Sequence, residues 1–302
     1  MQNSQELVSI VVPTFNQADF LTEALGSVTA QTHASWEAIV VNNFSTDHTV
    51  DVVNQIGDSR IALVNFANEG VIASSRNLGI SKARGKYVAF LDSDDKWEPS
   101  KLTKSIEVLS SGADLVCHAE RWFGGGSRER IVRYGPESRA SYDSLLLKGN
   151  CISTSAVVVR RSVLDQLNGF RTDPRFITTE DYDLWLRIAR EEFTISFIAE
   201  VLGSFRRHQT SASSSTTRHL LAELAVVNDH FASGRNFGPT IVKHRHALAH
   251  YTAARSYSKS SKFVDALGSF LTSLRLNPGR PRTWAGLLVH LASPLRKRKK
   301  RA

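Results

Sequence analysis

The most informative stretch runs from Tyr87 to Leu102 and reads YVAFLDSDDKWEPSKL. Its apolar start is typical of a buried strand, and it ends abruptly in the acidic run at 92–95. Three carboxylates within four residues repel one another, and hard divalent cations prefer carboxylate oxygens. In an open α/β sheet, ligands bind at the carboxyl ends of the strands. The pattern therefore favours a metal-assisted binding site over a solvated acidic turn, although Asp95 alone also fits a helix N-cap.

Alternating strands and helices surround this stretch. Apolar runs predict strands at 8–12, 38–41, 61–65 and 87–91, and helical spacing predicts helices at 19–31, 47–56, 71–83 and from about 99. This alternation indicates βαβ units in a parallel sheet with right-handed crossovers. Later strands are predicted at 115–119, 156–160 and 201–207, and later helices at 162–167 and 179–191. Residues 247–276 have the pattern of a helix hairpin that ends at Asn277.

Composition places the chain among cytosolic or membrane-surface proteins. Its 302 residues are 41% hydrophobic, which is enough for a proper core. Only two cysteines occur, so no disulfide framework is expected and a reducing compartment fits. The N-terminal residues lack a signal-peptide pattern, and no uninterrupted apolar stretch reaches the length of a membrane span. We therefore expect a cytoplasmic location.

The net charge of +9 is concentrated near the C-terminus. Residues 239–302 hold fourteen Lys and Arg against one acid, Asp265, whereas the rest of the chain carries a net charge of −4. The apolar segment at 281–295 precedes a basic run at 296–301, which is the pattern of an interfacial helix with a polybasic anchor. An anionic membrane surface is therefore a candidate partner. Packing on the rest of the chain or on a partner protein stays open, and no nucleic-acid motif is present.

Four segments together resemble a known family. They are VSIVVPTFNQADFLTEALGSVTAQ (8–31), WEAIVVNNFSTDHTVDVV (36–53), NEGVIASSRNLGISKARGKYVAFLDSDDKWEPSKL (68–102) and LNGFRTDPRFITTEDYDLWLRIAR (167–190). In this order and spacing they resemble the inverting nucleotide-sugar glycosyltransferases of family 2. The resemblance covers Val8 to His208. It implies an α/β GT-A fold with a mainly parallel central sheet flanked by helices. A catalytic domain at 1–215 and a helical, basic C-terminal extension at 216–302 are then expected.

The resemblance also implies a nucleotide-sugar site. The residues expected there are Pro13, Thr14, Asn16, Asn42, Arg76, Asp92 and Ser93. The alternatives to these binding roles are an ordinary turn after the first strand and, at position 76, an exposed helix arginine. Where the family usually has a carboxylate, this chain has Asn42, whose amide can both accept and donate hydrogen bonds. The base is therefore expected to be uridine, with guanosine or thymidine left open.

Metal and catalytic roles follow from the same resemblance. Asp94 is assigned to Mg²⁺ or Mn²⁺, and His208 to the same metal or to the diphosphate. Asp181 is assigned as the general base that removes the proton of the acceptor hydroxyl, with Glu180 beside it. A carboxylate can act in this way when it lies within hydrogen-bond reach of the hydroxyl. The alternative is that the acid pair only favours the start of a helix.

The expected function is transfer of a sugar from a nucleotide sugar to a hydroxyl, with metal assistance and inversion. The donor is expected to be a UDP-sugar. The acceptor is expected to be a glycan or lipid-linked acceptor of bacterial cell-surface polysaccharide synthesis, at the inner face of the cytoplasmic membrane. A nucleotidyltransferase and a non-catalytic nucleotide- or glycan-binding scaffold are the alternatives. The absence of a glycine-rich phosphate loop argues against the first, and the intact Asp94 and Asp181 argue against the second.

Overall fold

The computed structural model describes residues 6–126, 128–208, 215–233 and 236–299, with side chains of the last helix up to Ala292. Contacts between Cα atoms divide the chain into two compact units. The first, the sheet unit, consists of Met1–Leu145, Asn150–Pro174 and Glu180–Ser211. The second, the helical unit, consists of Leu146–Gly149, Arg175–Thr179 and Ala212–Ala302.

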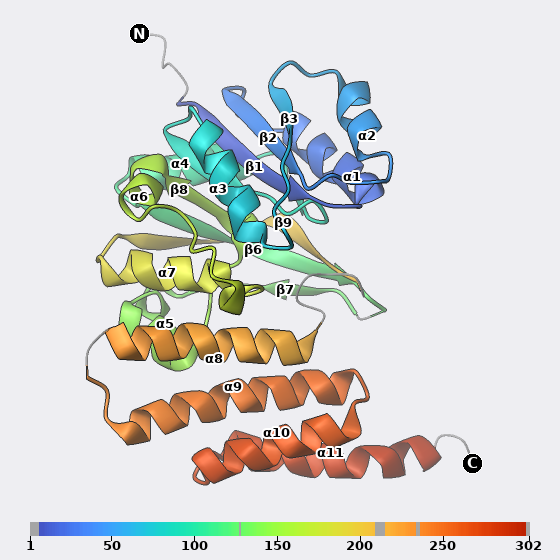
Figure 1. Ribbon diagram of the computed structural model, residues 1–302, viewed down its shortest axis with the longest axis vertical. Coiled ribbons are helices and arrows are strands. Elements are labelled where there is room, and N and C mark those ends of the chain that lie inside the picture. The colour runs from blue at the N-terminus through green and yellow to red at the C-terminus, as the bar shows by residue number, and fades with distance from the viewer. Residues whose placement is uncertain (1–5, 127, 209–214, 234–235, 300–302) are drawn as a thin grey trace. The chain divides into compact units, whose positions relative to one another are not determined.

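The first half of the sheet unit alternates strands with helices, as predicted (Figure 1). Its elements are β1 (Val8–Thr14), α1 (Ala18–Thr29), β2 (Trp36–Asn42), α2 (Thr49–Ile56), β3 (Ile61–Asn65), α3 (Ile72–Lys82) and β4 (Tyr87–Phe90). Strands β3, β2, β1 and β4 are neighbours in that order, and each pair is parallel. The expected βαβ units are thereby confirmed. Because these strands run in one direction, their carboxyl ends meet at one edge of the sheet.

The second half of the sheet unit mixes strand directions. Its elements are β5 (Lys96–Trp97), α4 (Lys101–Ser110), β6 (Leu115–Gly124), β7 (Arg130–Val132), α5 (Tyr142–Lys148), β8 (Val157–Arg160), α6 (Arg161–Gln166), α7 (Glu180–Arg190) and β9 (Ile195–Arg207). Of α5, only residues 142–145 belong to this unit. Strand β8 is antiparallel to both β4 and β6, and β9 is parallel to β6. Two reversals therefore return β6 to the direction of β4. The sequence did not indicate β5, because two residues show no periodicity.

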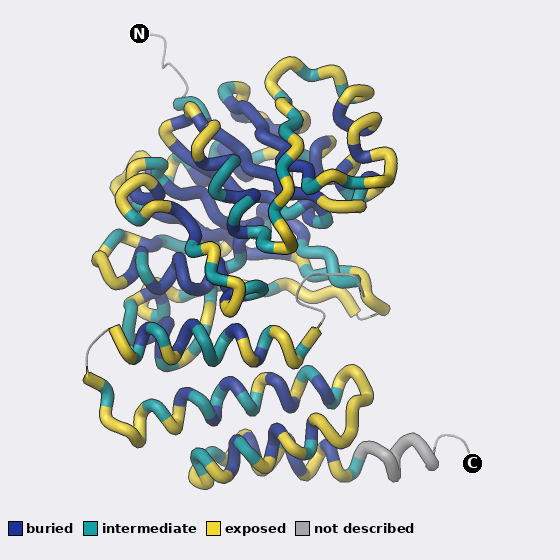
Figure 2. Tube along the Cα trace, in the orientation of Figure 1, coloured by how far each residue is buried: buried dark blue, intermediate teal, exposed yellow. Residues whose placement is uncertain are grey.

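The core of the sheet unit joins α1 to the central strands. Leu21 and Leu25 of α1 belong to one buried cluster with Val8 and Ile10 of β1, and all four are fully buried. Burying a large aliphatic side chain contributes about 1.5–3 kcal/mol. Figure 2 shows the strands as the buried interior of this unit. The loops at the carboxyl edge are therefore mounted on a rigid base.

The helical unit contains α8 (Thr216–Ser233), α9 (Pro239–Lys259), α10 (Phe263–Leu276) and α11 (Pro281–Lys299). Buried Ala249 and Ala253 of α9 pack with Ala266 of α10, which confirms the predicted helix hairpin. Among the described residues, no helix has both the length and the apolarity needed to cross a membrane. In the predicted basic run at 296–301, the side chains of 296–299 lie outside the described part of the structure, and so do residues 300–301.

Candidate active site

Hydrogen bonds fasten the loop after β1 to the loop after β2. Asn16 Oδ1 accepts the Thr46 N–H at 2.7 Å. Asp47 Oδ2 accepts the Ala18 N–H at the start of α1 at 2.9 Å, and Asp47 Oδ1 accepts the Thr49 N–H at the start of α2 at 3.1 Å. One carboxylate thus satisfies the first turns of two helices, where backbone donors have no partner within the helix. The two loops form one fixed surface at the carboxyl edge of the sheet.

The predicted nucleotide-binding residues of these strands are mostly buried. Pro13 and Thr14 complete β1, and the buried hydroxyl of Thr14 has no hydrogen-bond partner in the described part of the chain. Asn42 is only 1% exposed. Its Nδ2 donates to Asn65 Oδ1 at 2.8 Å, and its Oδ1 accepts the Ser45 N–H at 3.0 Å. The amide of Asn42 therefore has protein partners at both ends, and its expected contact with the base stays a prediction.

Two exposed aromatic rings lie on the same loops. Phe15 is 53% exposed and Phe44 is 59% exposed. Phe44 also has a φ of +53°, a left-handed conformation that bulky residues rarely adopt. Strained backbone of this kind clusters at functional sites. Phe15 lies between the predicted nucleotide-binding residues Thr14 and Asn16, but only the structure reveals that both rings are exposed.

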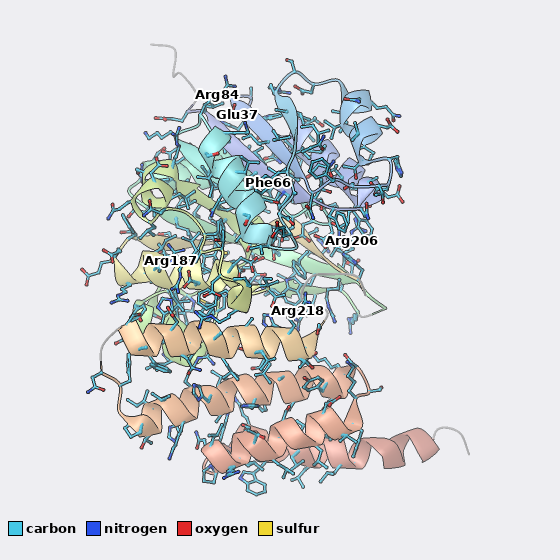
Figure 3. The ribbon with its side chains drawn as sticks, viewed as in Figure 1. Glu37, Phe66, Arg84, Arg187, Arg206 and Arg218 are labelled. Atoms are coloured by element: carbon cyan, nitrogen blue, oxygen red, sulfur yellow. The ribbon has the colours of Figure 1, made fainter. Side chains whose placement is uncertain are left out.

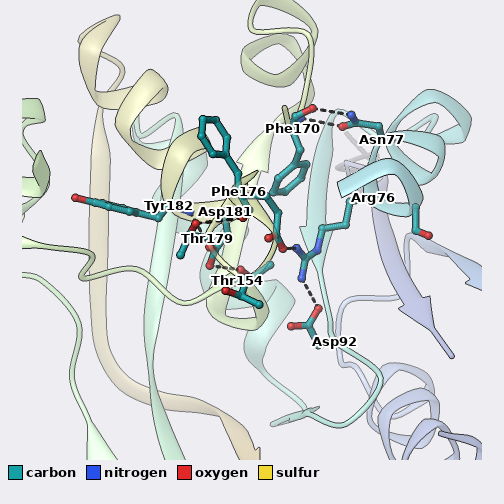
Figure 4. A network of polar contacts seen from close by, with 12 residues as sticks. Arg76, Asn77, Asp92, Thr154, Phe170, Phe176, Thr179, Asp181 and Tyr182 are labelled. Atoms are coloured by element: carbon teal, nitrogen blue, oxygen red, sulfur yellow. Dashed lines mark hydrogen bonds and ion pairs between the residues drawn. The ribbon is translucent and has the colours of Figure 1, made fainter. Parts of the chain in front are cut away.

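Arg76 of α3 joins the two predicted acidic segments (Figure 4). Its guanidinium donates to Glu180 Oε1 at 2.6 Å and to Asp92 Oδ1 at 2.7 Å, and its side chain is 4% exposed. Burial alone lowers the pKa of Arg76, but attraction to Asp92 and Glu180 outweighs burial and raises it. The alternative of an exposed helix arginine is therefore wrong. A contact with the nucleotide stays a prediction, because both terminal nitrogens already face carboxylates.

A short turn at 153–155 presents three successive hydroxyl side chains to the acidic groups. Thr154 Oγ1 donates to Asp181 Oδ2 at 2.9 Å (Figure 4). Ser155 Oγ accepts the Asp92 N–H at 3.1 Å, and Ser153 hydrogen-bonds Glu120. The sequence analysis missed this turn. The run Ser-Thr-Ser before an apolar strand was its only signal, and which acids it meets depends on the sheet order.

Asp94 and His208 come together, as the sequence analysis predicted for a metal site. His208 Nε2 lies 2.7 Å from Asp94 Oδ2, and both side chains are largely buried. Burial raises the pKa of Asp94, and the nearby negative charge of Asp92 raises it further. The carboxylate therefore lies where added positive charge is favoured. Among the described residues no group of three His, Cys, Asp or Glu side chains is arranged to hold a metal, so the assignment of Asp94 and His208 to a metal stays a prediction.

The rest of the acidic run has structural partners. Ser93 Oγ donates to Gln17 Oε1 at 2.5 Å, which ties the run to the start of α1. Asp95 is buried and accepts the N–H of Arg206 at 2.8 Å, and burial raises the pKa of this carboxyl well above its usual value. Arg206 (Figure 3) also reaches Glu23 Oε2 at 2.7 Å. Asp95 therefore anchors β9 beside the site, rather than capping a helix.

Removing the buried arginine should strongly destabilise the sheet unit. We expect Arg76→Met to lower the free energy of unfolding by about 3–5 kcal/mol, because it leaves two largely buried carboxylates without their counter-charge. The matched change Lys86→Met breaks an exposed ion pair with Glu6 and should have little effect, since solvent screens it. Urea unfolding followed by tryptophan fluorescence measures both. Equal effects would show that the buried bridge contributes no more than a surface pair.

Comparisons of sequence agree with this geometry. A family model described as "Glycosyl transferase family 2" matches residues 9–167, more than half of the chain. The putative teichuronic acid biosynthesis glycosyltransferase TuaG of Bacillus subtilis is 33% identical over 220 residues, which cover 71% of this chain and 84% of the relative. The UDP-Glc:alpha-D-GlcNAc-diphosphoundecaprenol beta-1,3-glucosyltransferase WfgD of Escherichia coli is 30% identical over 230 residues, which cover 74% and 86%.

Solved structures share the fold. S. aureus TarS in complex with UDP superposes with a TM-score of 0.61 at 18% identity, over 95% of this chain and 91% of that chain. The mannosyltransferase PcManGT from Pyrobaculum calidifontis, in complex with GDP-Man and Mn2+, gives a TM-score of 0.64 at 18% identity, over 96% and 81%. These likenesses confirm the predicted GT-A fold, and the relatives favour a glycosyltransferase over a nucleotidyltransferase. The chain belongs to glycosyl transferase family 2.

Proposed function

We propose that this enzyme transfers a sugar, with inversion, from a UDP-sugar to a hydroxyl of a lipid-linked glycan, with Mg²⁺ or Mn²⁺ held by Asp94 and His208. The observation that carries the proposal is the convergence of acidic groups at one edge of the sheet. Arg76 links Asp92 to Glu180, which is the neighbour of Asp181 in sequence. Asp94, two residues after Asp92, pairs with His208. An inverting transfer needs a donor site, charge stabilisation for the leaving group and a base, and this edge offers each.

The loops after β1 and β2 are the proposed nucleotide site. The ring of Phe15 offers a stacking surface, and stacking of a base on an aromatic ring contributes about 1–3 kcal/mol. The buried Thr14 hydroxyl, which has no partner among the described residues, offers a hydrogen bond to the donor. Uridine is the proposed base because WfgD is named for UDP-Glc and the TarS structures contain UDP and UDP-GlcNAc.

Asp94 and His208 fit a divalent cation. The oxygen and imidazole nitrogen 2.7 Å apart are ligands that Mn²⁺ accepts, and Mg²⁺ takes one or two carboxylates plus phosphate oxygens and water. The raised pKa of Asp94 agrees with a site that lacks positive charge. When bound, such an ion supplies Lewis-acid stabilisation of the leaving diphosphate.

Asp181 is the proposed base. It is half-buried at the first turn of α7, where Thr154 fixes one of its oxygens at 2.9 Å. In the proposed reaction the acceptor oxygen bonds to the anomeric carbon, the bond to UDP breaks, and the proton of the hydroxyl passes to Asp181. Glu180 is less suited to this role, because it is 5% exposed and its Oε1 accepts from Arg76. Asp181 therefore removes the proton, and Glu180 supports the arrangement.

The acceptor is the least constrained part of the proposal. TuaG is named for teichuronic acid biosynthesis, and WfgD for transfer to a sugar on diphosphoundecaprenol. We therefore assign the chain to bacterial cell-surface polysaccharide synthesis, with a polyprenyl-diphosphate-linked sugar as acceptor. Such an acceptor places the enzyme at the cytoplasmic face of the membrane.

A thermal-shift screen of nucleotide sugars with and without Mn²⁺ tests the donor assignment. UDP-sugars should raise the melting temperature, and the shift should grow with Mn²⁺, because a ligand that binds only the folded state stabilises it. GDP- and dTDP-sugars at the same concentration should have smaller effects. Stabilisation by GDP-sugars alone would assign guanosine, not uridine, as the nucleoside of the donor. No stabilisation by any donor would count against the proposed function.

The last helix supports a peripheral membrane role. Trp284, Leu288 and Leu291 of α11 are 50%, 66% and 46% exposed, and their spacing places them on one helical face. An exposed apolar stripe followed by basic residues is typical of a helix that lies in the membrane interface. We therefore propose that α11 holds the enzyme beside its lipid-linked acceptor.

Deleting residues 281–302 should release the protein from anionic vesicles. Each basic residue near an anionic leaflet contributes about 1 kcal/mol, and the apolar stripe adds burial. UDP-sugar binding should be unchanged, and high salt should weaken binding of the full chain because ions screen its charge. Vesicle sedimentation measures this. Equal sedimentation of the truncated and full-length proteins would remove the membrane role from this helix.

A further inference from the structure

The hairpin formed by β6 and β7 carries an unusual excess of exposed positive charge. We call residues 120–126 and 128–134 the arginine hairpin. Arg121, Arg128, Arg130 and Arg133 are all exposed, whereas the acids are Glu129, which is exposed, and Glu120, which is buried. Glu129 lies 3.7 Å from Arg121. In the described part of the chain the other three arginines have no acidic partner. Like charges crowded on one hairpin are destabilising unless an anion offsets them.

The sheet order places this hairpin beside the reacting groups. Strand β6 runs in the direction of β4, so its carboxyl end lies at the same edge as Asp92. Strand β8 separates β6 from β4, whereas β1 and β2 lie on the other side of β4. The acidic run that follows β4 therefore lies between the nucleotide loops and the arginine hairpin. Gly124 pairs with Arg207, and the next residue, His208, bonds Asp94.

An aromatic framework holds the hairpin rigid. The Arg130 guanidinium lies 4.6 Å from the centroid of the Trp122 ring, which packs 4.8 Å from Phe205 of β9. Trp122 Nε1 donates to the Tyr134 hydroxyl at 3.2 Å, and that hydroxyl donates to buried Glu120 at 2.5 Å. Arg130 is thus held in place by stacking, and the N–H groups of its planar guanidinium can donate hydrogen bonds to an anion. Such a fork matches phosphate oxygens in pairs.

We propose that the arginine hairpin binds the diphosphate of the polyprenyl-diphosphate-linked acceptor, with Arg130 as its main contact, because Arg130 lies on the same face of the hairpin as Trp122 and Glu120. This inference rests on the proposed function. The donor diphosphate is assigned to the Asp94–His208 pair, so the cationic surface of the hairpin beside that pair suits a second diphosphate. In a monosaccharide acceptor, one sugar ring separates the diphosphate from the attacked hydroxyl. The hairpin would therefore orient that hydroxyl toward Asp181.

The test compares two acceptors with the variant Arg130→Gln. One acceptor is N-acetylglucosaminyl diphosphate on a short alkyl chain, and the other is the matching alkyl glycoside without the diphosphate. We expect KM for the diphosphate acceptor to rise roughly tenfold, equal to about 1.4 kcal/mol. The KM for the glycoside and for the UDP-sugar should be unchanged. Lys82→Gln, an exposed cation in the last turn of α3, is the matched control and should leave every parameter unchanged.

Binding of an alkyl diphosphate to enzyme saturated with UDP and Mg²⁺ gives a second readout that needs no turnover. The Arg130→Gln variant should bind this probe roughly tenfold more weakly. Unchanged binding, a raised KM for the UDP-sugar, or equal losses with both acceptors would overturn the assignment. Loss of binding to phosphatidylglycerol vesicles with unchanged probe binding would instead assign the hairpin to a membrane surface. A wild-type enzyme that binds no UDP-sugar would point to failure of the proposed function itself.

Discussion

Replacing Asp181 by Asn should lower turnover by roughly 10²- to 10⁴-fold, the range typical of losing a general base. Asn is nearly isosteric. Its carbonyl oxygen can accept the Tyr182 N–H and its amide nitrogen can donate to the Thr154 hydroxyl, so the turn at 153–155 should keep its geometry. It cannot take up a proton at neutral pH. The dissociation constant for the UDP-sugar should be unchanged, because the nucleotide loops are formed by other strands. Steady-state rates and donor titrations measure the two quantities separately.

Two further variants sharpen this test. Thr154→Val removes the hydroxyl that positions Asp181, so it should lower turnover less than Asp181→Asn does. The pH dependence of turnover in Thr154→Val should still report Asp181 as the base. Asp51→Asn removes an exposed acid from the first turn of α2 and should have no effect on rate. If Asp181→Asn keeps near-wild-type turnover and Glu180→Gln does not, the proton is removed by Glu180 and the assignment is wrong.

The sequence predicted most of the first half of the fold because its signals there are local. Buried strands such as β1 are mostly apolar, and the turns between them carry polar residues, so periodicity alone places β1 to β4. The resemblance to family 2 then added the fold. Strand β5 was missed because its pairing depends on a distant partner, β9. The short length of this strand leaves no pattern to detect.

The candidate site was predicted as a set of residue types but not as a network. That Asp94 meets His208 across 114 positions was implied by the resemblance, and the structure places them together. That Arg76 is buried between Asp92 and Glu180 could not be predicted, because α3 has no clear apolar face to show which side is buried. The partners of Thr154 and Ser155 likewise depend on where β8 enters the sheet. Long-range polar contacts therefore mark the limit of prediction from one sequence.

Replacing Asp94 by Ala should reduce transfer by roughly 10³-fold or more. Lewis-acid stabilisation of a leaving group contributes several kcal/mol, and each 1.36 kcal/mol corresponds to a factor of ten in rate. Asp94 is the one carboxylate that pairs with His208 among the described residues, so Ala leaves a single imidazole in place of the proposed ligand pair. We also expect the affinity for the UDP-sugar to lose its dependence on added Mn²⁺. Rates and donor titrations across a Mn²⁺ series measure both effects.

The metal dependence separates a ligand role from a purely structural role for Asp94. Wild-type enzyme treated with a chelator should lose activity and regain it with Mn²⁺ or Mg²⁺, whereas Asp94→Ala should not be rescued by either ion. His208→Ala should retain part of its activity and require more Mn²⁺, because the carboxylate that binds a hard cation remains. If wild-type donor affinity is the same with and without metal, Asp94 is not a metal ligand. Its buried pair with His208 would then hold the end of β9 against the acidic run. In that case Asp94→Ala would lower the melting temperature without changing the response of the enzyme to metal.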